Sequence, residues 1–173
     1  PAHASLHVYV GANGGVIDTD GFNVTIGEDI ENVSGEDGVV RFTGDGVVTF
    51  TGTANHTGGT IVDAGTKLVL TAAAKTSLFA NGVSVAIPAG GAADGAVVFE
   101  ITGGGAFTQS DIDDHTAISG DSVGRYALVL SDNGTKIVLT DTLAGEYVWN
   151  GGSSGASWKT AGYWTKNGVA GNW

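Results

Sequence analysis

The chain has 173 residues, a length that suits one domain with a real core, and 42% of them are hydrophobic, which excludes a disordered tail. Its 18 acidic and 7 basic side chains give a net charge of −11, which repels nucleic acid and anionic membranes. No apolar run approaches the roughly 20 residues of a spanning helix, so we expect no membrane insertion by this segment. Without cysteine the chain has no disulfides and lacks the best zinc ligands.

The first residues resemble a signal-peptidase site. The sequence Ala2-His3-Ala4 has the A-x-A pattern of such sites, with Ser5 as the natural mature start. We therefore interpret residues 1–4 as the remainder of a cleavage region, and we expect the protein to be secreted or placed on the outer surface of a bacterium.

Short apolar and β-branched runs then alternate with glycine-rich turns along the chain. Thirty glycines and only two prolines disfavour helices and supply many tight turns, so the sequence predicts an all-β fold. A single helical turn is plausible only at residues 72–79. The predicted strands are residues 6–10, 16–18, 22–26, 39–42, 47–50, 60–62, 67–70, 83–87, 96–101, 126–130, 136–139 and 146–149.

Several of these runs are near copies of one another. Residues 39–44 (VVRFTG) recur eight positions later as 47–52 (VVTFTG), and residues 66–71 (TKLVLT) recur as 135–140 (TKIVLT). Such copies predict strands that stack on equivalent neighbours. Strands of three to five residues favour a β-helix-like stack, whereas the eight-residue spacing favours the antiparallel pairs of a β-sandwich. We expect a β-repeat domain over residues 5–145 and a tryptophan-rich segment or cap over 146–173.

The middle of the chain resembles a known repeat. Residues 46–52 (GVVTFTG), 54–60 (ANHTGGT) and 63–68 (DAGTKL) are similar to the autotransporter-associated β-strand repeat, with its G-x-L-T-L-x-G strand, N-x-Y-T-G-G-T turn and V-x-A-G-T-L strand. The best match covers residues 46–70. It departs from the pattern at His56, where an aromatic residue is usual, and at the additional Lys67. The resemblance implies a right-handed β-helix, or a β-rich companion to one, in a large exported protein.

The segment Ile17-Asp18-Thr19-Asp20-Gly21 resembles the catalytic loop of aspartic peptidases. Two such loops share one proton between their carboxylates, and Asp18 and Asp20 are the candidates here. However, Asp20 stands where glycine should follow threonine, and the nearest second copy, residues 141–145, departs further. The alternative interpretation is a turn between two strands, for which Asp-Gly is a common signal.

A second acidic segment is a candidate metal site. Asp111, Asp113, Asp114 and His115 place three carboxylates and an imidazole within five residues. Oxygen-rich segments of this kind suit calcium, and the histidine would also allow zinc. The alternative is a solvated acidic loop, and the sharp-turn glycine of an EF-hand loop is missing. We expect no obligatory cofactor.

The aromatic residues are concentrated at the C-terminal end. Trp149, Trp158, Tyr163 and Trp164 could stack on sugar rings, or they could close the hydrophobic end of the fold. These observations favour an exported scaffold or adhesin that binds host glycans or glycoproteins, without a catalytic centre. The rival hypothesis is a secreted aspartic-type peptidase acting on glycoproteins through Asp18 and Asp20.

Overall fold

The computed structural model describes residues 7–121, 123–143, 147–149, 164–166 and 169–170. The chain divides into two compact units, residues 1–142 and 143–173, and the protein is mostly β. None of the helices in the described residues has the length and apolar character needed to cross a membrane.

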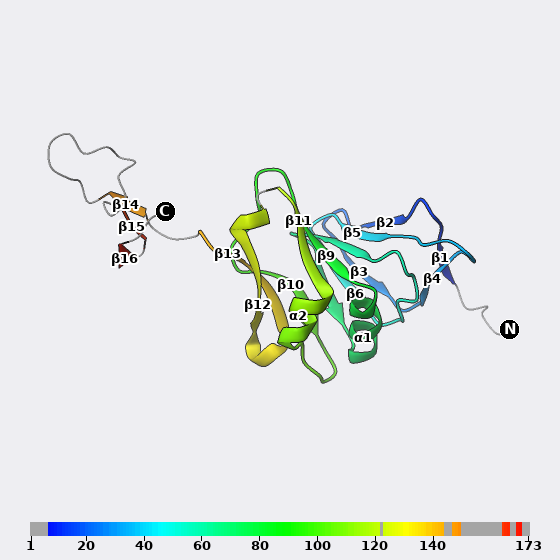
Figure 1. Ribbon diagram of the computed structural model, residues 1–173. Helices are drawn as coiled ribbons and strands as arrows, with labels where there is room; N and C mark the ends of the chain where they lie inside the picture. Colours follow the sequence, from blue (N-terminus) through cyan, green and yellow to red (C-terminus); the bar gives the residue numbers. More distant parts are fainter. Residues whose placement is uncertain (1–6, 122, 144–146, 150–163, 167–168, 171–173) are drawn as a thin grey trace. The chain divides into compact units, whose positions relative to one another are not determined.

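The first unit is built from short strands joined by turns (Figure 1). Its strands are β1 (Val8–Val10), β2 (Gly15–Asp18), β3 (Asn23–Ile26), β4 (Ile30–Asn32), β5 (Val40–Thr43), β6 (Val47–Phe50), β7 (Thr60–Asp63), β8 (Lys67–Leu70), β9 (Val83–Ile87), β10 (Ala96–Ile101), β11 (Thr116–Gly120), β12 (Tyr126–Ser131) and β13 (Lys136–Asp141). Two short 3-10 helices, η1 (Val123–Arg125) and η2 (Asp132–Gly134), flank β12.

Most of these strands pair in parallel within two sheets. One sheet has the order β11-β9-β7-β5-β2, and all its pairs are parallel. The other has the order β12-β13-β10-β8-β6-β3, parallel from β3 to β10 and antiparallel from β10 to β12. A third, short sheet joins β1 and β4 in parallel, and Ala54 continues it through a bridge to Ile30.

The near copies at residues 39–44 and 47–52 do not form the antiparallel pair that a sandwich would need. They contain β5 and β6, which lie in different sheets and pair with β7 and β8 respectively. A corner separates them, because Gly44 and Asp45 both have positive φ angles, of 97° and 60°. The eight-residue spacing therefore marks a change of sheet.

Alternate side chains of each strand point into one continuous core. Residues matched by the strand register stack on one another, so Val62 lies between Phe42 and Val85, and all three are fully buried. The other sheet contributes a parallel stack of fully buried Val48, Leu68 and Phe99. Burial of each such aliphatic or aromatic side chain contributes roughly 1.5–3 kcal/mol to the free energy of folding. The strand register stabilises the fold mainly by forming these buried stacks.

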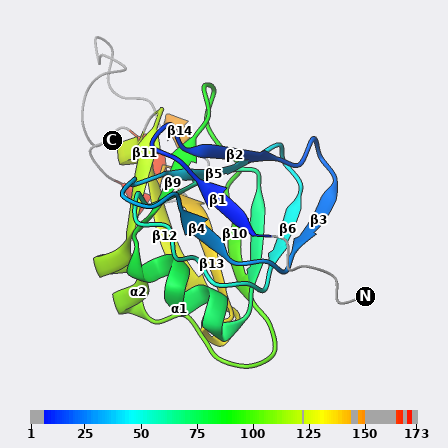
Figure 2. The same ribbon diagram turned by 90° about the vertical axis from the view of Figure 1, so that its right-hand side faces the viewer.

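Two helices lie side by side below the sheets (Figure 2). The helix α1 (Ala72–Ala80) is longer than the single predicted turn and begins at Thr71, whose side chain accepts a hydrogen bond from the Ala74 backbone. The helix α2 (Gln109–His115) was not predicted. It begins with a capping box in which Thr108 and Asp111 each bind the other's backbone N–H.

The second unit contains three short antiparallel strands. They are β14 (Tyr147–Trp149), β15 (Trp164–Lys166) and β16 (Val169–Ala170), in the order β14-β15-β16. The register places Trp149 directly opposite Trp164.

Candidate functional site

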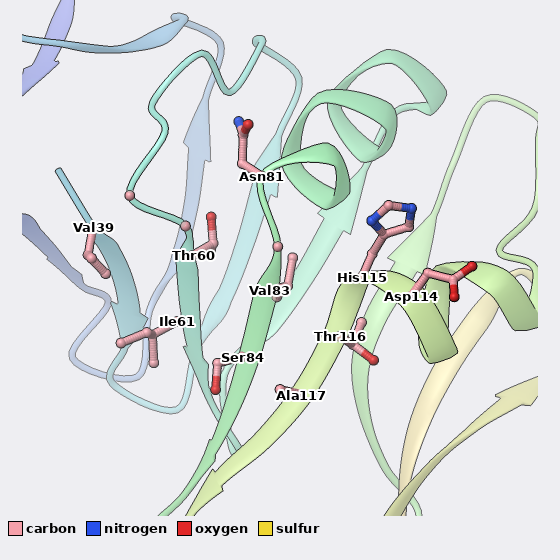
Figure 3. A pocket seen from close by; sticks show the side chains of 13 residues that line it. Val39, Thr60, Ile61, Asn81, Val83, Ser84, Asp114, His115, Thr116 and Ala117 are labelled. Atoms are coloured by element: carbon pink, nitrogen blue, oxygen red, sulfur yellow. The ribbon is translucent and has the colours of Figure 1, made fainter. Parts of the chain in front are cut away.

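A groove of about 420 Å³ crosses the beginnings of β7, β9 and β11 on the outer face of the five-stranded sheet (Figure 3). Its floor consists of residues that the strand register brings side by side, namely Ile61, Ser84 and Ala117. These residues come from three separate stretches of the sequence. The groove therefore exists only because the strands stack in register.

The wall of the groove is formed by the Thr57-Gly58-Gly59-Thr60 turn. A side chain at Gly58 would lie 2.5 Å from the backbone carbon of Gly38, and Gly59 has a φ angle of 86°. Both positions therefore require glycine, the first for space and the second for its backbone conformation. This turn lies within residues 54–60, one of the segments on which the predicted repeat resemblance depends.

Most hydroxyl and amide groups in the groove already have internal partners. Their hydrogen bonds join Thr60 Oγ1 to His56 Nε2 (3.0 Å), Ser84 Oγ to Ser119 Oγ (2.8 Å), Thr116 Oγ1 to the Ile112 carbonyl (2.7 Å) and Asn81 Nδ2 to the Ala54 carbonyl (3.0 Å). These bonds fix the side chains in place. A ligand would meet a surface made mostly of small, uncharged side chains, with the exposed Asp114 carboxylate and His115 imidazole at its edge (Figure 3).

His56 lies behind this surface and is fully buried. Burial lowers its pKa, although the nearby Gly59 backbone works in the opposite direction. Its Nδ1 atom is buried without a hydrogen-bond partner among the described residues. His56 thus belongs to the core, where burial favours the neutral imidazole.

The Asp18-Thr19-Asp20 segment forms a turn between β2 and β3. Asp18 accepts a hydrogen bond from the Asp20 backbone at 2.9 Å, and Asp20 and Gly21 have φ angles of 49° and 80°. The buried side chain of Thr19 accepts a bond from the Gly46 backbone at 2.9 Å and so ties this turn to the next corner. The aspartic-peptidase hypothesis stays a prediction for this segment.

The nearest second copy of the peptidase motif begins at Asp141, in the other sheet. Asp141 is buried and forms an ion pair with Arg125, whose Nε lies 2.8 Å from the carboxylate. The topology thus places Asp18 in β2 and Asp141 in β13, strands that share no sheet. A peptidase dyad would accordingly need two copies of Asp18 from two chains.

The four predicted metal ligands all lie on α2, not in a loop. Burial works to raise the pKa of Asp111, but hydrogen bonds from Lys75 and Thr108 outweigh it and hold the pKa below its usual value. Asp113 accepts a bond from Gln109, and Asp114 accepts one from Ser110.

The side chains of Asp114 and His115 point in different directions (Figure 3). Among the described residues, no three histidine, aspartate or glutamate side chains gather as a metal-binding group. A calcium or zinc site at Asp111, Asp113, Asp114 and His115 stays a prediction.

The predicted aromatic site lies in the second unit. Trp149 and Trp164 are cross-strand neighbours of β14 and β15, whereas Trp158 and Tyr163 lie outside the described residues. The sequence pattern did not lead to the groove, because its floor residues have no aromatic or charged signal of their own. The T-G-G-T turn was the one signal that could have located it.

Comparison with models of protein families gave no match. Curated proteins gave none either, and no solved structure matches. The resemblance to the autotransporter-associated repeat therefore stays a prediction based on residues 46–70, and the functional argument depends on the geometry of the chain itself.

Proposed function

We propose that the protein is a non-enzymatic, exported β-repeat scaffold that presents a binding surface for neutral glycans outside a bacterial cell. Its strands would form a right-handed β-helix-like stack. The parallel order of the two main sheets supports this arrangement, as does the return of Val40 to Thr60 and of Val47 to Lys67, each 20 residues further along. Such stacks expose long rows of side chains on a rigid backbone, which suits display and binding.

The observation that carries the proposal is the groove over β7, β9 and β11. It is open, about 420 Å³ in volume, and its floor is formed by small or uncharged side chains at Ile61, Ser84 and Ala117. A net charge of −11, with the Asp114 carboxylate at the edge of the groove, disfavours anionic ligands, whereas a neutral sugar chain meets no opposing charge. An oligosaccharide of neutral sugars fits these requirements.

The second surface that favours sugars is the aromatic segment. The strand register sets residue 149 opposite residue 164, both of which are tryptophan, and tryptophan is a residue on which sugar rings can stack. If the ligand binds in the groove, substitutions in the groove should abolish binding; if it binds to the aromatic segment, substitutions of the tryptophans should. An experiment can therefore assign the ligand to one of them.

A glycan array probed with the full chain tests the proposal. Ala117→Trp would fill the groove from an exposed position and should abolish binding there, while Val129→Trp places the same bulk on an exposed position of β12 as the control. Trp158→Ala and Trp164→Ala test the aromatic segment in the same assay.

Loss of binding in Ala117→Trp alone would assign the ligand to the groove. Loss in the two tryptophan variants alone would assign it to residues 146–173. A wild-type protein that binds no glycan on the array would remove the binding function and leave only the scaffold.

A further inference from the structure

The five-stranded sheet carries a single basic side chain. Its strands β2, β5, β7, β9 and β11 contain neither lysine nor histidine, and their one arginine is Arg41 in β5. Val39, Arg41 and Thr43 alternate with buried residues of the same stretch, so their side chains face outward. Arg41 is therefore the only cationic group that these five strands offer to a molecule bound on the outer face.

Arg41 lies directly beside the groove. The strand register pairs it with Ile61, one of the three floor residues. Neighbouring strands lie about 4.7–4.9 Å apart, so this arginine is one strand beyond the groove floor. Val39, two residues before Arg41, also lines the groove (Figure 3). A sugar chain that leaves the groove across β7 would therefore reach the Arg41 side chain next.

An internal comparison shows that the arginine is particular to this strand. Residues 39–44 and 47–52 are near copies that differ at one position only, which is Arg41 in the first and Thr49 in the second. Thr49 lies in β6, in the six-stranded sheet. The same strand pattern thus folds without an arginine, and the copy that borders the groove has one.

The Arg41 side chain is held by a small polar network. Its Nε and Nη2 atoms donate to Asp63 Oδ2 at 3.3 and 3.0 Å. Thr43 Oγ1 donates to the same Oδ2 at 2.6 Å. Only 19% of the Asp63 side chain is exposed, whereas 48% of the Arg41 side chain is. The carboxylate therefore fixes the guanidinium on the side of the sheet and leaves its other side to solvent.

The donors of this guanidinium are only partly used. A guanidinium has five N–H groups, and the bonds to Asp63 use Nε and Nη2, so the two N–H groups of Nη1 remain for another acceptor. Planar donors in a fixed arrangement suit two acceptors at a fixed separation, such as neighbouring oxygens of a sugar ring. Because Asp63 balances the charge of Arg41, the pair does not require an anionic ligand.

The ion pair adds little to the fold itself. It joins β5 to β7, which already pair through their backbones and bury Phe42 and Val62 on the inner face. Half-exposed ion pairs of this kind contribute little to stability. Lys67 and Glu100 form a similar pair between β8 and β10 on the other sheet, at 2.9 Å, and so provide a matched comparison.

We propose that Arg41 determines which glycan the groove accepts, by donating from Nη1 to two neighbouring oxygens of a sugar unit that lies over β5. This role depends on the glycan-binding function proposed above and defines its ligand class as neutral hexose chains with two adjacent free hydroxyl groups. A unit that lacks one of these hydroxyls leaves an N–H group without an acceptor. Asp63 and Thr43 are positioning residues that hold the guanidinium in place.

The probes are neutral oligosaccharides of glucose, galactose and mannose, with acidic glycans for comparison. An array identifies the one that the full chain binds most strongly, and calorimetric titration compares it with analogues in which one hydroxyl at a time is replaced by hydrogen. We expect removal of either hydroxyl of one adjacent pair to weaken binding by about tenfold.

The variant Arg41→Met assigns those two hydroxyls to the guanidinium. It should bind the parent oligosaccharide about as weakly as the wild type binds the two deoxy analogues, and it should bind parent and analogues equally, because the donor is already gone. Arg41→Lys keeps the charge without the planar pair of donors and should behave like Arg41→Met. Lys67→Met removes the cation of the matched pair on the other sheet and should bind every probe like the wild type.

Each other result contradicts a stated part of the proposal. If Arg41→Met binds all probes like the wild type while Ala117→Trp abolishes binding, the groove function stands and the role of Arg41 is wrong. A uniform loss in Arg41→Met, equal for the parent and every deoxy analogue, would also overturn the role in selectivity. Strongest binding of an acidic glycan overturns the ligand class. A wild type that binds no probe, or binds only through residues 146–173, removes the groove function and this role together.

Discussion

Lys75 of α1 and Asp111 of α2 form an ion pair at 2.8 Å, with only 15% and 12% of their side chains exposed. Asp111 also accepts the capping bonds of Thr108, so one carboxylate both begins α2 and fastens it to α1. Asp111 is also the first of the four predicted metal ligands on α2, so this carboxylate already has a structural role in holding the helix.

Replacing Lys75 with methionine should therefore destabilise the protein. The change keeps most of the apolar stem but leaves the Asp111 carboxylate with its Thr108 bonds alone, at a cost of about 1–2 kcal/mol in the free energy of unfolding. Urea denaturation measures this cost. Lys136→Met is the matched control, because its ion pair with Asp132 lies at the surface and should contribute nothing measurable. Equal effects of the two substitutions would contradict the structural role of Asp111.

The different burial of two register partners predicts unequal costs for the same substitution. Val24 and Val48 are register partners in β3 and β6, but Val24 is partly buried whereas Val48 is 0% exposed. Val48→Ala should cost about 2 kcal/mol, and Val24→Ala about half of that or less, because less contact is lost at the end of the stack. Thermal or urea unfolding gives the comparison. A larger cost at Val24 would contradict the difference in burial between the two positions.

The buried histidine predicts a loss of stability in mild acid. The pKa of His56 is lowered in the folded protein from an ordinary value of 6.5, so the folded state takes up this proton later than the unfolded state. Stability from this group is complete above pH 6.5. It falls as the pH drops below 6.5 toward the folded pKa, by at most about 1.4 kcal/mol per pH unit.

The variant His56→Phe separates this effect from other titrations. It fills the same position with an aromatic ring that cannot be protonated, so the free energy of unfolding should depend less on pH between 7.5 and 5.5. His115→Phe, the same substitution at an exposed position, is the matched control. A wild-type slope that persists in His56→Phe would show that His56 takes up its proton equally in both states.

The strands with strong apolar alternation could be predicted from the sequence. The ranges of β6, β8, β9 and β10 coincide with predicted runs, because each has a buried residue at every second or nearly every second position. Residues 22–26 were predicted as one strand that begins at Phe22. Phe22 is instead 69% exposed and lies before the strand, because Gly21, with a positive φ, belongs to the preceding turn and β3 begins only at Asn23.

Other elements could not be predicted, because tertiary contacts decide them. The strand β11 has the sequence TAISG, without an apolar run, and is a strand because β9 supplies its hydrogen-bond ladder. The helix α2 buries only Asp111 and Ile112, so no helical periodicity marked it, although the Thr108–Asp111 capping box is visible in the sequence. The groove likewise depends on pairing between turns, which no single stretch of sequence contains.

The turn at residues 18–21 offers a test that separates its structural role from the rival catalytic one. Thr19 Oγ1 accepts a bond from the Gly46 backbone and donates to the Thr43 carbonyl at 3.1 Å, so Thr19→Val should cost about 1–3 kcal/mol by leaving the Gly46 donor without that acceptor in a buried place. Asp18→Asn keeps an acceptor for the Asp20 N–H and should be nearly neutral for stability.

An aspartic peptidase would lose all activity in that same variant, because an amide cannot share the catalytic proton. We expect casein and glycoproteins to remain uncleaved by the wild type between pH 3 and 7. Cleavage that disappears in both Asp18→Asn and Asp20→Asn, with folding intact by circular dichroism, would replace the scaffold proposal with a peptidase.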